Sequence, residues 1–316
     1  MWGIEKEIEN DEHEIGCLSG NIVSDNREGR VTSQTSLIQA RSVLTRTSGY
    51  LTQVSSHSLN PYQGCSFGKT LCGVYCYVQH NSFVTKGRQW GQFLDVKQNA
   101  ADVYRRQFAR EQKWARQTIG QFGIFLASST DPYLPQEASQ KVTRSLLEAM
   151  LDKPPDALIV QTRSKLVSRD VDLLAELSQR SDVRIHVTIE SDRDGLPGLP
   201  RPASSVENRF TLVETMKSAG IRTIVTVSPL LPIKSPRAFF ERITRVADGV
   251  VIDHFIDGDG SRNGQRTWKT GLPEAMNQVD PRATSLEYRD EIIAIAREVM
   301  PERVGVSIEG FAGQFH

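Results

Sequence analysis

With 316 residues, of which 38% are hydrophobic and 24% charged, the chain can bury the core of one barrel-sized domain. Lysine plus arginine and aspartate plus glutamate both total 38, so the charge balance excludes a strong overall field for nucleic acid or an anionic membrane. Four cysteines are too few for a secreted disulfide framework, and no apolar run could span a bilayer, so we expect a cytoplasmic protein with no membrane partner.

The first 41 residues are predicted to form a polar N-terminal extension. They are rich in Asp, Glu, Asn, Ser and Arg and show no sustained hydrophobic period, which predicts partial disorder. From about Ser42 onward, short apolar runs alternate with amphipathic segments, as in βα units around a parallel sheet. We therefore expect an extension over 1–41 and one α/β domain over 42–316.

The alternation predicts seven strands, each short and rich in Val, Ile, Leu or Phe, as expected for strands covered on both faces. They are 50–59, 123–127, 157–161, 184–189, 223–227, 249–255 and 304–308. Six helices are predicted at 99–117, 135–151, 168–180, 205–218, 236–246 and 285–299. This count indicates a partial (β/α) barrel, in which the loops at the carboxyl ends of the strands carry the chemistry.

A loop of about thirty residues, 257–285, is long enough to predict a lid or a substrate-binding insertion. Asp253 and His254 on the sixth strand and Glu309 at the end of the seventh are further candidates for a pocket. Since side chains alternate along a strand, only one of Asp253 and His254 can face inward.

Three of the four cysteines, Cys65, Cys72 and Cys76, lie in one loop that follows the first predicted strand. Three thiolates from one loop can hold an iron–sulfur cluster by three corners and leave the fourth iron open. The alternative is a structural zinc site, for which His80 completes a Cys3His set; that would make a non-catalytic binding module for nucleic acid or protein. The expected position at a barrel mouth favours the cluster.

Together with the cysteines, several motifs resemble the radical S-adenosylmethionine superfamily and, within it, the spore photoproduct lyase-like group, also called DNA repair photolyases. The resemblance covers about residues 42–309. Its motifs occur in the family's order: SLNPYQGC at 58–65, YCY at 75–77, STDPYLPQE at 129–137, QTRS at 161–164, ENRF at 207–210 and VSPLLP at 227–232. The family's loop reads C-x3-C-x2-C, whereas this one reads C-x6-C-x3-C; a flexible loop accommodates the longer first gap at little entropic cost.

The resemblance implies a partial barrel of the radical SAM type with a [4Fe–4S] cluster on the three cysteines of this loop. It also implies that S-adenosylmethionine is cleaved reductively and that the resulting radical abstracts hydrogen from a substrate. An electron donor such as a flavodoxin or ferredoxin is implied as a partner, with DNA or another nucleic acid as the candidate substrate. The lyase of this group uses a cysteine as hydrogen donor, and here the remaining cysteine is Cys17, in the extension; substrate and catalytic residues therefore stay open.

The resemblance also implies which residues bind the cofactor. Tyr75 matches an aromatic position near adenine, although it could simply fill core. A group of small polar residues past the second strand would receive the ammonium or, alternatively, cap the next helix. These residues are Ser128, Ser129, Thr130 and Asp131.

Arg163, past the third strand, would pair with the methionyl carboxylate, for which a guanidinium is well shaped, and Lys165 is its competitor. Glu190 and Ser191, past the fourth strand, would bind the ribose hydroxyls; a solvated carboxylate is the alternative. His80, if it is no zinc ligand, could line the substrate pocket. The first long helix is basic and could face phosphates, but a solvated outer helix is favoured because Asp102 and Glu111 dilute its charge.

Overall fold

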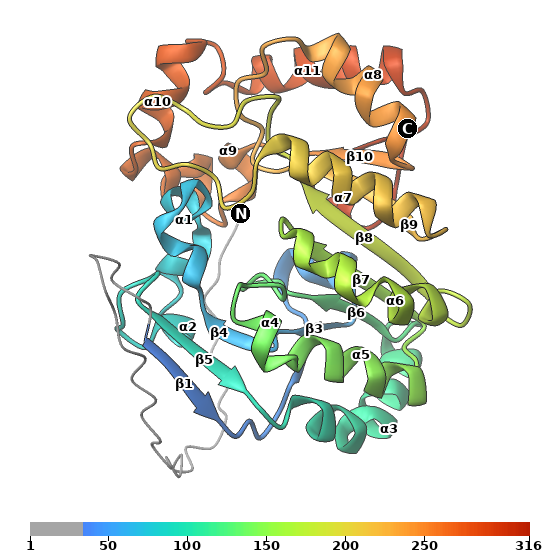
Figure 1. Ribbon diagram of the computed structural model, residues 1–316. Helices are drawn as coiled ribbons and strands as arrows, with labels where there is room; N and C mark the ends of the chain where they lie inside the picture. The colour runs from blue at the N-terminus through green and yellow to red at the C-terminus, as the bar shows by residue number, and fades with distance from the viewer. Residues whose placement is uncertain (1–33) are drawn as a thin grey trace.

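The computed structural model describes residues 34–316, and its centre is an eight-stranded sheet (Figure 1). The strands follow the order β11-β10-β9-β8-β7-β6-β3-β2, and all neighbours pair in parallel except β2 and β3. Seven parallel strands in chain order, joined by helices, confirm the predicted α/β partial barrel. None of the described helices is both long and apolar enough to cross a membrane.

Six of the seven predicted strands are present as mostly buried apolar runs. The first, predicted over 50–59, is a strand only at its end, because residues 49–53 form a 3-10 helix. The bounds of the strands, with the antiparallel β2, are β2 Leu44–Arg46, β3 His57–Leu59, β6 Gly123–Leu126, β7 Ala157–Thr162, β8 Asp182–Thr188, β9 Arg222–Val227, β10 Gly249–Ile252 and β11 Val304–Val306. The last two are shorter than predicted. Asp253 and His254 separate β10 from helix α9, Phe255–Gly258, whereas α12, Ser307–Phe311, begins directly after β11.

The main helices lie in an arc outside the sheet (Figure 1). They are α3 Ala100–Thr118, α5 Val142–Asp152, α6 Val171–Leu177, α7 Val206–Ser218, α8 Pro236–Val246 and α11 Leu286–Val299. The predicted helix over 135–151 is two helices, because Lys141 adopts a left-handed conformation between α4, Glu137–Gln140, and α5. The buried Glu137 carboxylate stabilises this break by accepting a hydrogen bond from the Thr143 amide at 3.0 Å.

A second, three-stranded sheet lies beside the first, in the order β1-β5-β4. Its strands are β1 Gln34–Ile38, β4 Tyr62–Gly64 and β5 Phe93–Lys97; β1 is parallel and β4 antiparallel to β5. The sequence placed β1 in the N-terminal extension. Residues 34–38 are instead packed, because β5 offers them an edge to pair with, while 1–33 lie outside the described residues.

A buried histidine in β8 predicts acid sensitivity. His186 is 1% exposed, and its Nδ1 has no hydrogen-bond partner among the described residues. Burial, and then the charges of Arg184 and Arg222, lower its pKa to about 3. The unfolded chain binds a proton near pH 6.5, whereas the folded one does so only near pH 3, so stability falls by about 1.4 kcal/mol for each pH unit between these values.

We expect His186→Gln to remove this dependence, because the amide does not titrate. The measurement is urea unfolding at pH 6.0 and 5.0 of the wild-type chain and the variant. The wild-type chain should lose about 1 kcal/mol more than the variant over this step. An equal loss in both proteins would show that His186 is not the responsible group.

Candidate active site

The cysteine loop connects β4 to β5 and folds into short helical turns. Cys65 follows β4 and is buried, while Cys72 lies in α1, Leu71–Tyr75, and Cys76 ends that helix; both of these are partly exposed. The Leu71 amide donates to the carbonyl of Arg201 at 3.0 Å, which ties the loop to the segment after β8. All three thiols are free. The fold thus brings the three predicted ligands together at the carboxyl end of the sheet.

The three thiols are close enough to influence one another electrostatically. Burial raises the pKa of Cys65 well above its usual range, and Cys72 and Cys76 add to this effect. Burial, followed by the charge of Cys72, raises the pKa of Cys76 to about 12, which the Arg163 guanidinium opposes. Three grouped thiolates are therefore unfavourable here unless a bound cation balances them, as a metal cluster would.

The described residues do not support the zinc alternative. No three His, Cys, Asp or Glu side chains among them are arranged to hold a single metal ion. His80 does not complete the thiol set; its electrostatic neighbours are Arg266, Asp259 and Lys269. Thiolates of an iron–sulfur cluster each bind a different iron and need not converge on one point, so the grouping still fits a cluster.

Close backbone packing gives the loop its shape. A Cβ built on Gly73 would lie 2.0 Å from the carbonyl oxygen of Gly68 in the preceding turn, Ser66–Lys69. We expect Gly73→Ala to push the two turns apart and to lower both the melting temperature and the iron bound after reconstitution. Gly123→Ala is the matched control, since its Cβ would make only an ordinary contact of 3.7 Å with Ser55. Equal behaviour of the two variants in thermal melts and iron assays would contradict the prediction.

Three of the residues assigned to the cofactor meet in one network around Glu190. This carboxylate is 3% exposed, and its Oε1 accepts hydrogen bonds from Arg163 and from the Tyr75 hydroxyl, both at 2.7 Å. Its Oε2 accepts from the buried Arg209, which also donates to the Thr188 carbonyl at 2.9 Å. Burial alone would raise the pKa of Glu190, but the charges of Arg209 and Arg163 outweigh it and lower the pKa to about 2.

The polar residues after β6 connect the cysteine loop to the strand ends. The Thr130 hydroxyl donates to the carbonyl of Gly64 at 2.8 Å, and Asn60 bonds the Ser128 hydroxyl and the Ser129 amide at 3.2 and 3.0 Å. Asp131 accepts from the Thr162 hydroxyl and the Arg163 amide, at 2.8 and 3.0 Å. None of these side chains caps α4, so the capping alternative is wrong. Binding of a cofactor ammonium stays a prediction.

The ends of the later strands carry the further pocket candidates, together with Ser228 and Ser307, which sequence reasoning did not single out. Asp253 is buried and accepts from the hydroxyls of Ser307 and Ser228, at 2.8 and 3.2 Å. His254 is also buried and bonds the Ala283 carbonyl at 3.1 Å. Because β10 ends at Ile252, both residues lie past the strand on which alternation was predicted. The Ser191 hydroxyl, which was predicted to bind the ribose, donates to the Pro232 carbonyl at 2.7 Å. Glu309, the other pocket candidate, is exposed on α12. Arg209, the buried partner of Glu190, was not predicted as a site residue, although it belongs to the ENRF motif at 207–210.

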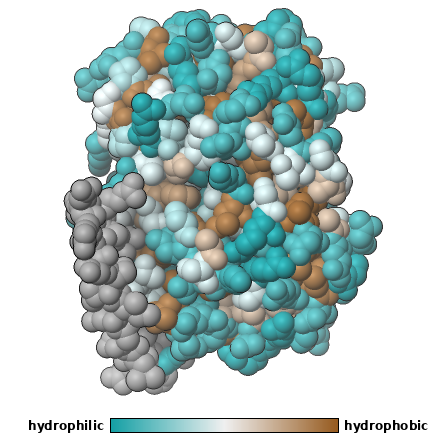
Figure 2. All heavy atoms as spheres, viewed as in Figure 1, coloured by the Kyte–Doolittle hydropathy of each residue, from teal (hydrophilic) through white to brown (hydrophobic). Residues whose placement is uncertain are grey.

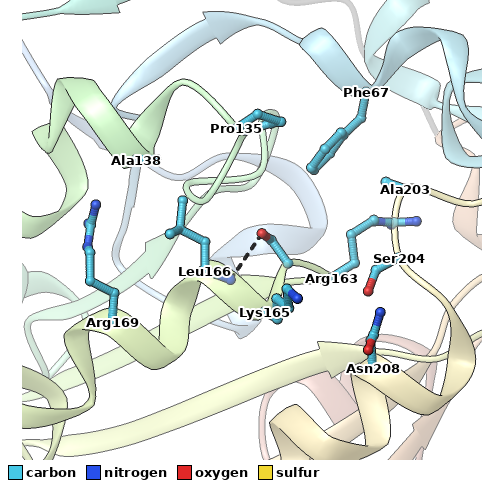
Figure 3. A pocket seen from close by; sticks show the side chains of 11 residues that line it. Phe67, Pro135, Ala138, Arg163, Lys165, Leu166, Arg169, Ala203, Ser204 and Asn208 are labelled. Atoms are coloured by element: carbon cyan, nitrogen blue, oxygen red, sulfur yellow. Dashed lines mark hydrogen bonds between the residues drawn. The ribbon is translucent and has the colours of Figure 1, made fainter.

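A pocket of about 510 Å³ lies beside the cysteine loop (Figure 3). Phe67 and Arg163 line it, with Lys165, Arg169, Ser204 and other residues around them. Arg163 pairs with Glu190, and Arg169 pairs with both Glu137 and Asp170. The pocket lining itself contains no carboxylate. Lys165, which is exposed and has no ion-pair partner among the described residues, is therefore the cation of this lining that is available to an anionic group.

Three of the five cations of α3 are neutralised by ion pairs. Arg105 pairs with Asp152 at 3.1 Å, and Arg116 pairs with Asp156 at 2.5 Å. Arg110 pairs with Glu111 of the same helix at 2.7 Å. These contacts support the expected solvated outer helix rather than a face for phosphates.

No family model matches the chain. An uncharacterized protein of Methanocaldococcus jannaschii is 25% identical over 240 residues, which are 76% of this chain and 85% of that protein. An uncharacterized protein of Mycobacterium tuberculosis is 29% identical over 181 residues, 56% of this chain. That match spans only half, 50%, of the mycobacterial protein.

Solved structures with a similar fold include a mutant spore photoproduct lyase, with a TM-score of 0.55 and 16% identity over 91% of this chain and 88% of that one. A spore photoproduct lyase complexed with dinucleoside spore photoproduct has a TM-score of 0.54 and 16% identity, covering 86% of this chain and 81% of its own. At the level of the fold, these similarities confirm the resemblance predicted from the sequence motifs.

Proposed function

We propose that the chain is a radical S-adenosylmethionine enzyme with a [4Fe–4S] cluster on Cys65, Cys72 and Cys76. The observation that carries this proposal is the grouping of three free thiols from one loop at the mouth of a partial barrel with the fold of spore photoproduct lyase. When bound, the cluster supplies the electron for reductive cleavage of the cofactor. The protein's own task is to position the cofactor and shield it from water.

Each cofactor contact is proposed from the position of a side chain. Arg163 faces the thiols and lines the adjoining pocket, so it would pair with the methionyl carboxylate, with Lys165 as the second cation there. Glu190 fixes the guanidinium of Arg163 and the hydroxyl of Tyr75, which would hold that ring beside adenine. Ser128, Ser129, Thr130 and Asp131 would face the ammonium end, with Ser191 near the ribose.

For the substrate we propose a nucleic acid, with a damaged base as the specific target. Support comes from the similar fold of a spore photoproduct lyase that was solved with a dinucleoside lesion. A lyase-type reaction that needs a cysteine as hydrogen donor would have to use Cys17, which lies outside the described residues. We further propose a flavodoxin or ferredoxin as electron donor and a reducing cytoplasm as the compartment, because free, grouped thiols need one.

The test is anaerobic reconstitution with iron and sulfide, followed by addition of dithionite and S-adenosylmethionine. We expect about four iron and four sulfide per chain, as a [4Fe–4S] cluster requires, and formation of 5′-deoxyadenosine. One zinc per chain that survives in air, with no acid-labile sulfide and no 5′-deoxyadenosine, would refute the proposal. The same outcome would restore the zinc-stabilised binding module.

A further inference from the structure

The segment 257–285 forms a lip beside the cysteine loop. We use lip for Arg262, Arg266, Trp268 and Lys269, which lie in and around the turns Arg262–Gly264 and Thr267–Lys269. Burial, and then the positive charges of Arg266 and Lys269, lower the pKa of His80, which follows the cysteines in this loop. The lip therefore lies close to the cysteine loop. Figure 1 shows the same arrangement, with α9 and α10, Leu272–Val279, next to α1.

Of the carboxylates of this segment, Asp259 is buried, whereas Asp257 and Glu274 are exposed. Asp259 is 4% exposed and accepts hydrogen bonds from the amides of Ser261 and Thr267, both at 2.8 Å. Asp257 pairs with Arg289 at 2.7 Å. Asp259 is thereby engaged by backbone amides and Asp257 by an arginine outside the lip. Glu274 has no ion-pair partner among the described residues, so one surface carboxylate stands against the cations of the lip.

The cations of the lip point outward. Arg262 and Lys269 are exposed, and neither has an ion-pair partner within the part of the chain that the structure describes. By contrast, Arg105, Arg110 and Arg116 of α3 are paired with neighbouring acids. The neutral total charge of the chain therefore conceals a local positive surface at the mouth of the barrel.

Trp268 adds an aromatic surface to these charges. Its indole is 47% exposed, although its edge contact with Phe255, 5.5 Å between ring centres, holds it in place. A hollow of about 560 Å³ adjoins the ring and is lined by Thr270, Pro273, Glu274, Asn277 and Gln278. A fixed ring next to side-chain amides can stack a base and offer hydrogen bonds to its edge.

We propose that the lip binds a single-stranded stretch of nucleic acid, with one base stacked on Trp268 in the hollow and flanking phosphates on Arg262 and Lys269. This inference rests on the proposed function and assigns it a substrate-binding surface. An acidic protein partner is the other candidate for a positive surface. The hollow beside Trp268 favours the nucleic acid, and on the face seen in Figure 2 the apolar residues form small, scattered patches.

The experiment is fluorescence anisotropy with a labelled thymidine 20-mer and the full, reconstituted chain at several salt concentrations. We expect Trp268→Ala to weaken binding about tenfold. The double variant Arg262→Ala/Lys269→Ala should also weaken binding and lower the slope of log affinity against log salt by about 1.4, which corresponds to two phosphate contacts on a single strand. Trp268→Phe should retain most of the affinity.

The matched control is Arg106→Ala/Lys113→Ala on α3. Like the lip variant, it removes one exposed arginine and one exposed lysine, but far from the mouth of the barrel. It should bind like the wild-type chain. Equal losses in the two double variants, or wild-type affinity in both lip variants, would overturn the proposal. If the lip variants bind the oligonucleotide normally but accept electrons slowly from reduced flavodoxin, the surface belongs to a protein partner, and the proposal is likewise overturned.

This binding test separates the lip from the enzymatic proposal. Binding of the oligonucleotide needs no S-adenosylmethionine and no reductant, whereas cofactor cleavage in dithionite needs no oligonucleotide. A chain that cleaves the cofactor but binds the 20-mer equally well with and without Trp268 would refute the lip alone. A chain that binds through the lip but forms no 5′-deoxyadenosine would refute the enzymatic proposal alone.

Discussion

Cys65→Ala, Cys72→Ala and Cys76→Ala are each expected to abolish reductive cleavage of S-adenosylmethionine. Each removes one corner of a three-point attachment, and no side chain among the described residues stands ready as a substitute, since His80 faces the lip instead. Iron and sulfide content after reconstitution and the yield of 5′-deoxyadenosine measure the effect. The loss should be complete within detection rather than partial, because an unattached cluster does not persist.

Cys17→Ala is the matched control for these variants, since it removes a thiol of the same kind from outside the loop. It should reconstitute and cleave the cofactor like the wild-type chain. Retained cleavage in Cys65→Ala would contradict the three-cysteine assignment and require another ligand. A Cys17→Ala variant that cleaves the cofactor but completes no turnover of substrate would identify this cysteine as a hydrogen donor.

Glu190→Gln is expected to give the largest loss of stability among single substitutions near the site. The change leaves Arg163 and the buried Arg209 without their shared counter-charge, and breaking a buried pair in this way costs about 3–5 kcal/mol. Urea unfolding at pH 7 measures the loss. Glu207→Gln, which breaks the exposed pair with Arg242, is the control and should change stability little.

The stabilising effect of Glu190 should also depend on pH in a defined direction. Its pKa is lowered from 4.5 to about 2 in the folded chain, so its stabilisation is complete above pH 4.5 and is lost as the pH falls toward 2. The difference between the wild-type chain and Glu190→Gln should therefore be the same at pH 7 and pH 5.5 and should shrink below pH 4.5. A difference that already shrinks between pH 7 and 5.5 would point to another titrating group.

The barrel could be predicted because its signals are local. A strand such as β9 is a short apolar run, and α7 begins where the Ser205 hydroxyl accepts from the Asn208 amide at 3.2 Å. The small sheet could not be predicted, because β1 is half polar and becomes a strand only through pairing with β5, which lies far along the chain. The break in the helix over 135–151 likewise depends on a buried carboxylate that no local period reveals.

The sequence pointed to the residues of the network around Glu190 one by one but not to their contacts. The motifs included Tyr75 and Arg163, and Glu190 was named from its place past the fourth predicted strand. Their mutual hydrogen bonds arise from three different segments that meet at the end of the sheet. The segment 257–285 was predicted as a lid or a substrate-binding insertion. That Asp259 faces inward, while Arg262 and Lys269 are exposed, depends on the hydrogen bonds of its turns.

The small sheet also determines the order in which this side of the molecule can form. Gly64 at the start of the cysteine loop pairs with Leu94 at its end, and β1 must wait for the same strand β5. During synthesis, all three cysteines therefore leave the ribosome before the strand that closes their loop exists. Such non-local pairings form slowly, so we expect the thiols to stay accessible for a period before the base of the loop is closed.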